Sequence, residues 1–151
     1  MATYTKFNQF VEDLLNKVHD LFGTSGSGAD ALKVYLSNTA PNTTTNAIKA
    51  DLAEITNQNG YTAPVSVANA GTRSTGTVTV QGTSLTITAS GGTVGPFRYV
   101  VLYNDTPTAP ADPLVAYWDY GSSITLNDGE SFSVKFNNAN VGSAGDIFTL
   151  A

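Results

Sequence analysis

The chain has 151 residues, a formal net charge of −5 and a charged fraction of only 13%. A length of this order corresponds to one domain with a single sizeable core. The acidic balance, with basic residues scattered singly, excludes the basic patch of a nucleic-acid binder. We also expect no membrane partner, because the sequence holds no apolar run near 18 residues. The chain has no cysteine, so it has neither disulfides nor thiolate metal ligands.

The segment 4–22 carries the strongest helical pattern in the chain. Its apolar residues recur at steps of three and four, and polar residues occupy the other side. We predict an amphipathic helix capped by Thr3 or Thr5 and ended by Gly23. Its apolar face either docks on the rest of the chain or meets a neighbouring subunit, because part of it follows the spacing of a short coiled-coil seam. The predicted assembly residues are Phe7, Phe10, Val11, Leu14, Val18 and Leu21.

Composition divides the chain into three predicted parts. Residues 1–23 form the N-terminal helix, residues 24–30 form a flexible joint rich in Gly and Ser, and residues 31–151 form a β domain. The joint lacks the Gly-Lys-Ser/Thr ending of a phosphate-binding loop, so a linker is the favoured interpretation.

The β domain begins with an alternating pattern at 31–37, which predicts a half-buried strand. Apolar residues at helical spacing between 48 and 55 predict a short second helix or turn, capped by Thr45 or Asn46. The polar segment 57–61 predicts a turn in which Gly60 takes a positive φ.

Two runs rich in β-branched and aromatic residues, 97–103 and 114–120, are the predicted centre of the fold. The segment between them holds three prolines and cannot continue a strand ladder. Both runs are apolar at nearly every position, which is typical of strands covered on both faces. We predict a long-looped β-hairpin in the core.

Further hairpins are predicted on either side of this one. Strands at 78–80 and 85–87 flank a predicted turn at Gln81–Thr83, and strands at 124–126 and 132–136 flank the turn signal Asn127–Glu130. The last run, 146–150, is predicted to close a sheet edge. Seven to nine short strands indicate a mainly β fold: an antiparallel β-sandwich or jelly-roll with one N-terminal amphipathic helix and a short second helix.

Candidate catalytic and metal-binding residues are few. His19 is the only histidine, which leaves no Ser-His-Asp or His-rich metal arrangement within one chain, and we expect it to be solvated on the polar side of the first helix. Asp105, Asp112 and Asp119 flank the central hairpin, where turn formation is favoured over a glycosidase pair or Ca²⁺ ligation. The segment Asn127–Glu130 receives the same interpretation. We predict no catalytic residue, no cofactor and no metal.

Five aromatic side chains gather on the two central strands: Tyr99, Tyr103, Tyr117, Trp118 and Tyr120. Aromatic platforms can stack on sugars, so a carbohydrate site is one hypothesis. Aromatic residues within apolar runs more often fill a core, and that interpretation is favoured here.

The chain resembles small virion structural proteins of tailed bacteriophages. The resemblance spans Met1 to Phe136, through the segments MATYTKFNQFVEDL, DALKVYLSNTAPN, GPFRYVVLYNDTPTAPADPLVAYWDYG and SITLNDGESFSVKF. It implies a non-enzymatic structural protein located in the virion, most simply a capsid decoration or cement protein that stabilises the head by docking between capsomers. The expected partners are the major capsid protein or other virion subunits, together with copies of itself in a homo-oligomer. The alternatives are a tail-fibre or surface module that binds glycan through the aromatic hairpin and its loop, and a tail or neck completion protein.

Overall fold

The structure, a computed structural model, describes residues 2–22 and 29–151. The predicted mainly β, antiparallel fold is confirmed, whereas Gly23 and most of the joint expected at 24–30 lie outside the described residues. The strands are β1 (Thr3–Lys6), β2 (Leu32–Ser37), β3 (Val65–Val67), β4 (Asn69–Ser74), β5 (Thr77–Thr83), β6 (Leu85–Thr88), β7 (Val94–Asn104), β8 (Leu114–Leu126), β9 (Ser131–Val134) and β10 (Ala144–Leu150). The helical elements are α1 (Asn8–Leu15) and two 3₁₀ turns, η1 (Lys49–Asp51) and η2 (Phe136–Asn138).

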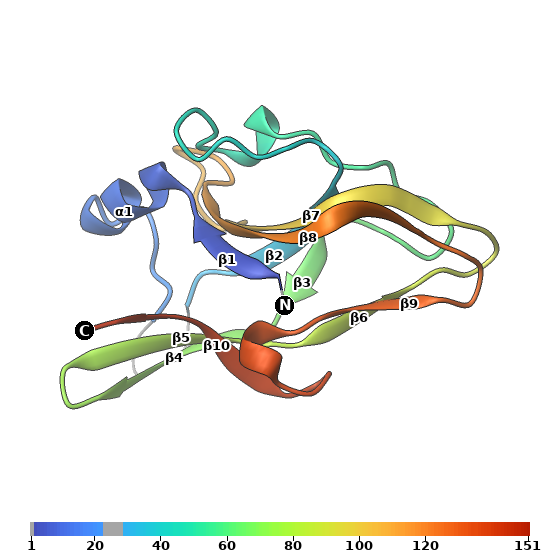
Figure 1. The fold of residues 1–151 in the computed structure, drawn as a ribbon. Coiled ribbons are helices and arrows are strands. Elements are labelled where there is room, and N and C mark those ends of the chain that lie inside the picture. The colour runs from blue at the N-terminus through green and yellow to red at the C-terminus, as the bar shows by residue number, and fades with distance from the viewer. Residues whose placement is uncertain (1, 23–28) are drawn as a thin grey trace.

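The strands form two facing layers (Figure 1). The upper layer is a five-stranded antiparallel sheet in the order β1-β8-β7-β2-β3. The lower layer contains a three-stranded ladder, β10-β5-β4, and a two-stranded ladder, β6-β9. These two ladders follow one another because only Ser84 separates β5 from β6, and its buried hydroxyl accepts a hydrogen bond from the backbone N–H of Phe136 at 3.1 Å. The arrangement is sandwich-like.

The central hairpin predicted from the two apolar runs is confirmed as β7 and β8, which pair from Val94↔Leu126 to Tyr103↔Leu114. Residues alternate between the two faces of the sheet because side chains on a strand point to opposite sides in turn. Val100 and Leu102 belong to the main core between the layers. Val101 and Tyr103 belong to a second core on the outer face of the sheet. The near-continuous apolar pattern therefore reflects burial on both faces.

The outer face is covered by the chain between β2 and β3. Leu52 packs into the second core, and its carbonyl accepts a hydrogen bond from the hydroxyl of Tyr35 at 3.3 Å. The backbone N–H of Ile55 donates to the carbonyl of Leu36 at 2.9 Å, which holds the covering segment along β2. The strand predicted at 31–37 is confirmed, and this cover explains why it is buried on both faces rather than half-buried.

The N-terminal helix predicted over 4–22 is wrong in its extent. Residues Thr3–Lys6 form β1 and pair with β8, with Tyr4 opposite Trp118. Helix α1 is capped by Phe7 without a side-chain hydrogen bond, so the predicted cap at Thr3 or Thr5 is also wrong. The helix ends at Leu15. Two residues later Lys17 takes a φ of 60°, a conformation that cannot continue a right-handed helix. Hydrogen bonding to β8 outweighs the local helical periodicity at the N-terminal end.

The short second helix predicted over 48–55 is reduced to the single 3₁₀ turn η1. The Asp51 carboxylate accepts hydrogen bonds from the backbone N–H groups of Ala47 and Ile48, at 2.8 and 3.0 Å. These two bonds hold the pKa of Asp51 below its usual range. The chain after η1 is then drawn out along β2, so no further helical turn forms. The turn at 57–61 is confirmed, with a φ of 90° at Gly60.

Two of the predicted hairpins are wrong in their pairing. β5 runs straight through the expected turn Gln81–Thr83 and pairs with β4 and β10, while β6 pairs with β9. Gly82 is needed inside β5 because a Cβ there would lie 2.9 Å from side-chain atoms of both Ile147 and Val67. The turn at Asn127–Glu130 exists, but it carries the chain from β8 in the upper layer to β9 in the lower one. The C-terminal strand β10 lies at a sheet edge, as predicted.

Candidate functional site

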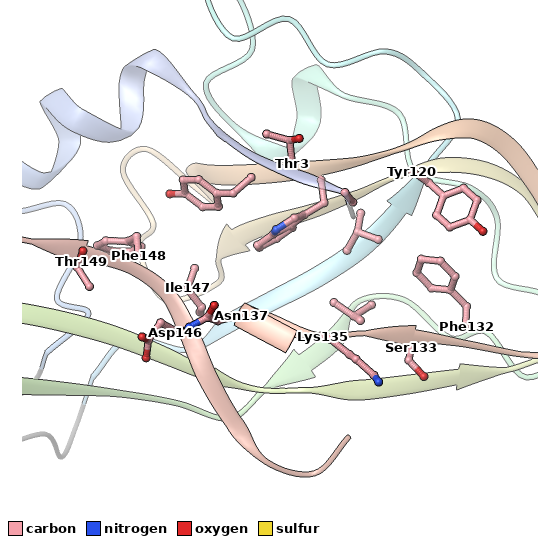
Figure 2. Close-up of a pocket in the computed structure, with 15 residues that line it drawn as sticks. Thr3, Tyr120, Phe132, Ser133, Lys135, Asn137, Asp146, Ile147, Phe148 and Thr149 are labelled. Atoms are coloured by element: carbon pink, nitrogen blue, oxygen red, sulfur yellow. Dashed lines mark hydrogen bonds between the residues drawn. The ribbon is translucent and has the colours of Figure 1, made fainter. Parts of the chain in front are cut away.

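A groove of about 760 Å³ opens between the two layers, and Figure 2 shows its lining residues. β1 ends the five-stranded sheet, β10 ends the three-stranded ladder, and β9 has a single neighbour, β6. All three of these strands line the groove, so it runs along the edges of both layers. We call it the aromatic groove; its lining is Ala2, Thr3, Tyr4, Val100, Trp118, Tyr120, Phe132, Ser133, Val134, Lys135, Asn137, Asp146, Ile147, Phe148 and Thr149.

Aromatic rings hold one another in place along this groove. The Trp118 indole makes T-shaped contacts with Tyr4 at 5.7 Å and with Phe136 at 5.5 Å between ring centroids. Tyr120 is 53% exposed and meets the Phe132 ring at 5.9 Å, again nearly edge to face. Burial raises the pKa of Tyr4 to about 12, so its hydroxyl is protonated at neutral pH. The contacts between these rings hold the aromatic side chains in fixed orientations within the fold.

Polar side chains lie among these rings. The Asp146 carboxylate accepts a hydrogen bond from Gln81 Nε2 at 2.8 Å and one from Asn137 Nδ2 at 3.5 Å. An ionised carboxylate has about four acceptor positions, so Asp146 can accept further bonds. Lys135 also borders the groove, but its ammonium group points away from the aromatic rings, on the opposite side of the chain from Phe132 (Figure 2). The groove therefore offers free carboxylate acceptor positions beside its aromatic surfaces.

The five aromatic residues singled out in the sequence divide between the two faces of the sheet. Tyr99, Tyr103 and Tyr117 lie on the outer face with the second core, whereas Trp118 and Tyr120 lie on the groove side. Tyr99 and Tyr103 are buried, as the core interpretation predicted. Strand alternation explains the division because Tyr117 and Trp118 are adjacent and must point to opposite faces. The sequence did not single out Tyr4 or Phe132, since each belongs to a separate short strand.

The loop between β7 and β8 lies away from the aromatic groove. Its residue Asp105 donates a backbone N–H to the carbonyl of Ala31 at 2.9 Å, and its residue Asp112 accepts from the N–H of Lys49 at 2.9 Å. These bonds tie the loop to the chain before β2 and to η1. The loop therefore does not extend the aromatic surface that the sequence associated with it.

A second exposed apolar surface lies on α1. Val11 and Leu15 are one helical turn apart and are 42% and 82% exposed, and Leu150 at the end of β10 is 49% exposed. A smaller cavity of about 250 Å³ lies beside them, and both Val11 and Leu150 line it. We call Val11, Leu15 and Leu150 the helix patch.

The predicted assembly residues fall into three groups. Phe7, Phe10 and Leu21 are buried within the chain, so their side chains belong to its own core. Leu14 and Val18 are partly buried. Val11 is exposed in the helix patch. The role of these residues in assembly stays a prediction, and in this fold it can rest directly only on the exposed part of the helix.

His19 is buried, and the expectation of a solvated histidine on a helix is wrong. It lies beyond the end of α1, against the Phe10 ring at 5.1 Å, and its Nδ1 lies 3.0 Å from Asn104 Nδ2. Burial lowers the pKa of His19, and the nearby carboxylates of Asp13 and Asp30 oppose that effect. The same amide of Asn104 donates to Asp30 at 2.6 Å, so this polar cluster links the chain after α1 to the end of β7.

The candidate carboxylates are held by separate partners. Asp105 forms an ion pair with Lys33 at 2.6 Å, and Asp119 forms a two-pronged pair with Arg98 at 2.7 and 2.8 Å. Both pairings hold the pKa of the aspartate below its usual range. Among the described residues, no group of three or more His, Cys, Asp or Glu side chains is placed to hold a metal ion.

The side chains of Asp128 and Glu130 each accept a hydrogen bond from a backbone N–H group. Asp128 accepts from the backbone N–H of Gly91 at 2.7 Å, and Glu130 accepts from that of Asn127 at 2.7 Å. The Glu130 bond is the local turn chemistry expected of the segment, whereas the Asp128 bond joins the turn to Gly91, 37 residues away in the chain.

The fold and its surfaces define a small antiparallel β-sandwich-like protein with an aromatic groove between two sheet edges. No helix within the described residues is long and apolar enough to cross a membrane. Comparison of the chain with protein-family models, curated proteins and solved structures finds no match.

Proposed function

We propose that this chain is a non-enzymatic structural protein of a phage particle, a capsid decoration or cement protein that docks between capsomers. The sequence resemblance to virion structural proteins supports the setting, and the helix patch supports the mode of action. The proposed partners are the major capsid protein or neighbouring virion subunits, and copies of the chain itself.

The exposure of the helix patch is the observation that carries this proposal. A leucine that is 82% exposed on a short helix leaves most of its apolar side chain in water. Burying such a side chain against a partner stabilises the complex by roughly 1.5–3 kcal/mol. Val11 and Leu150 add to the same surface, beside a small cavity that a partner side chain can fill.

A modest contact is sufficient for this role. A decoration protein meets a lattice on which the same contact recurs many times, and copies joined to one another bind that lattice more tightly than one copy alone. The low charged fraction of the chain, 13%, suits a surface that packs against neighbours. We therefore propose docking through α1, with the β-sandwich as the rigid body that carries it.

The test is binding to heads of the phage that encodes the chain, prepared without this protein. Wild type should co-sediment with the heads, and the double variant Val11→Glu/Leu15→Glu should lose most of that binding. Val141→Glu is the matched control, because Val141 is 47% exposed near the opposite end of β10 and outside the helix patch. Normal binding by the double variant, with its fold intact by circular dichroism, would contradict docking through α1.

Electron microscopy of the intact particle tests the location. Density for the chain on the head, at boundaries between capsomers, is the expected result. Density in a sixfold or twelvefold ring at the neck or tail would instead favour a completion protein, and the decoration role would then be abandoned.

A further inference from the structure

We propose that the aromatic groove is a binding site for a neutral oligosaccharide. This inference is independent of the docking proposed for α1, because no residue of the helix patch lines the groove; only the small cavity beside the patch shares Tyr4, Phe148 and Thr149 with it. It gives the chain a second role, the recognition of glycan on a surface that the particle meets.

The aromatic rings provide the stacking surfaces that sugars require. A sugar ring presents an apolar face of C–H groups, which packs on an aromatic side chain held in a fixed orientation. Trp118 is held by edge contacts with Tyr4 and Phe136, and Tyr120 is held by Phe132 while remaining half exposed. Little side-chain freedom is lost on binding, which favours affinity at a shallow site.

The polar groups suit the hydroxyls at the rim of a sugar ring. A hydroxyl both donates and accepts, so it pairs best with a mixture of acceptors and donors. The Asp146 carboxylate is oriented by Gln81 and Asn137 and keeps free acceptor positions. Thr149 lines the groove and carries a hydroxyl that can donate and accept.

The size of the groove favours an oligosaccharide over a single sugar. Its volume of about 760 Å³ lies within the range of ligand sites, roughly 300–1,000 Å³. Tyr120 and Phe132 lie toward one end, and Asp146 and Phe148 lie toward the other (Figure 2). A chain of several sugar units can therefore contact the aromatic end and the carboxylate end together.

The charges of the site point to a neutral ligand. The groove carries one carboxylate, that of Asp146, and the chain as a whole has a net charge of −5. An acidic glycan would meet electrostatic repulsion from the protein. A neutral glycan meets no such penalty.

An extended peptide that adds a strand to the groove is the alternative occupant, and the strand edges disfavour it. Charged residues on exposed edges discourage the addition of a further strand. Each strand that borders the groove carries or adjoins one: Lys6 lies on β1, Asp146 on β10, and Lys135 directly follows β9. The same charges do not hinder a ligand that binds through side chains.

Trp118 is the only tryptophan in the chain, so its fluorescence reports directly on the groove. We expect a saturable change in emission when full-length protein is titrated with at least one of maltohexaose, cellohexaose and chitohexaose. Tyr120→Ala should raise the dissociation constant about three- to tenfold, the effect of losing one aromatic contact. Asp146→Asn should also weaken binding, whereas Val141→Ala, outside the groove, should leave it unchanged.

Each result of this titration either supports or contradicts the proposal. Saturable binding that Tyr120→Ala and Asp146→Asn weaken and Val141→Ala does not would support the proposal. The proposal fails if none of the three sugars changes the emission, or if binding survives both groove variants at full strength. A response to extended peptides from other virion subunits, with none to sugars, would assign the groove to strand addition. Head binding by the same variants, measured separately, tests the docking role without reference to the sugar result.

Discussion

Both faces of the five-stranded sheet carry aromatic residues, but those on the outer face are buried and those on the inner face border an open groove. On the outer face, Tyr99 and Tyr103 are sealed beneath the chain that joins β2 to β3. On the inner face, Leu102 is buried in the main core, whereas Trp118 and Tyr120 lie beside an open groove. The faces differ in what covers them: the segment between β2 and β3 packs on the outer face, whereas the groove lies on the inner face beside the edge strands β1, β9 and β10.

This difference separates aromatic residues that stabilise the fold from those available to a ligand. Neighbouring residues on one strand take opposite roles, as Tyr117 contacts Phe7 at 5.6 Å on the closed face while Trp118 lines the groove. Aromatic content alone therefore does not mark a site. A site is marked by aromatic residues that stay exposed after the two layers have packed.

Tyr103→Ala should have the largest effect on stability. Tyr103 is buried on the closed face, with its ring 5.9 Å from that of Tyr35, and its removal leaves a cavity. We expect a loss of about 3–5 kcal/mol in the free energy of unfolding, measured by urea denaturation. Tyr103→Phe, which keeps the ring and loses the hydrogen bond to Asp105, should cost no more than about 1.5 kcal/mol. Equal costs for the two variants would show that the closed face does not depend on packing of this ring.

Gly145→Ala tests the wall of the groove, where η2 packs against the start of β10. A Cβ at this position would overlap the carbonyl oxygen of Phe136, which is backbone and cannot rotate away. We expect a destabilisation of about 1–3 kcal/mol in the same denaturation experiment. Ala144→Ser, at the exposed neighbouring position, should change stability by less than about 0.5 kcal/mol. An unchanged unfolding curve for Gly145→Ala would mean that η2 is not held tightly against β10.

His19 should make the stability of the folded protein depend on pH. Burial lowers the pKa of His19 in the folded state, so the unfolded chain takes up the proton first as the pH falls below about 6.5. The contribution of neutral His19 to the free energy of unfolding should therefore be fully present above that pH. It should decrease as the pH falls towards the folded-state pKa of His19. His19→Gln should flatten the dependence of the melting temperature on pH in this window. An unchanged slope would assign the dependence to other groups.

Tyr120→Ala should have the smallest effect on stability. More than half of the Tyr120 side chain is in water, so its removal costs less contact than removal of a buried ring. We expect a loss below about 1 kcal/mol, or roughly 2–4 °C in the melting temperature. A loss comparable to that of Tyr103→Ala would place Tyr120 in the core and remove the contrast between the two faces.

Several elements could be predicted from the sequence because their signals are local. The central hairpin follows from two runs of β-branched and aromatic residues around a proline-rich segment, and the turn at Gly60 follows from a residue that tolerates positive φ. The closing strand β10 follows from a short run of apolar and β-branched residues near the C-terminus. In each case neighbouring residues determine the backbone.

The pairing of strands and the position of the groove were decided by the tertiary structure. Thr3–Lys6 has a helical pattern but pairs with β8, more than a hundred residues away, and β6 pairs with β9 rather than with the adjacent β5. Residue types constrain which segments become strands, whereas hydrogen bonding and burial between distant segments select their partners. The aromatic groove forms where β1, β9 and β10 end their layers, so no single stretch of sequence specifies it.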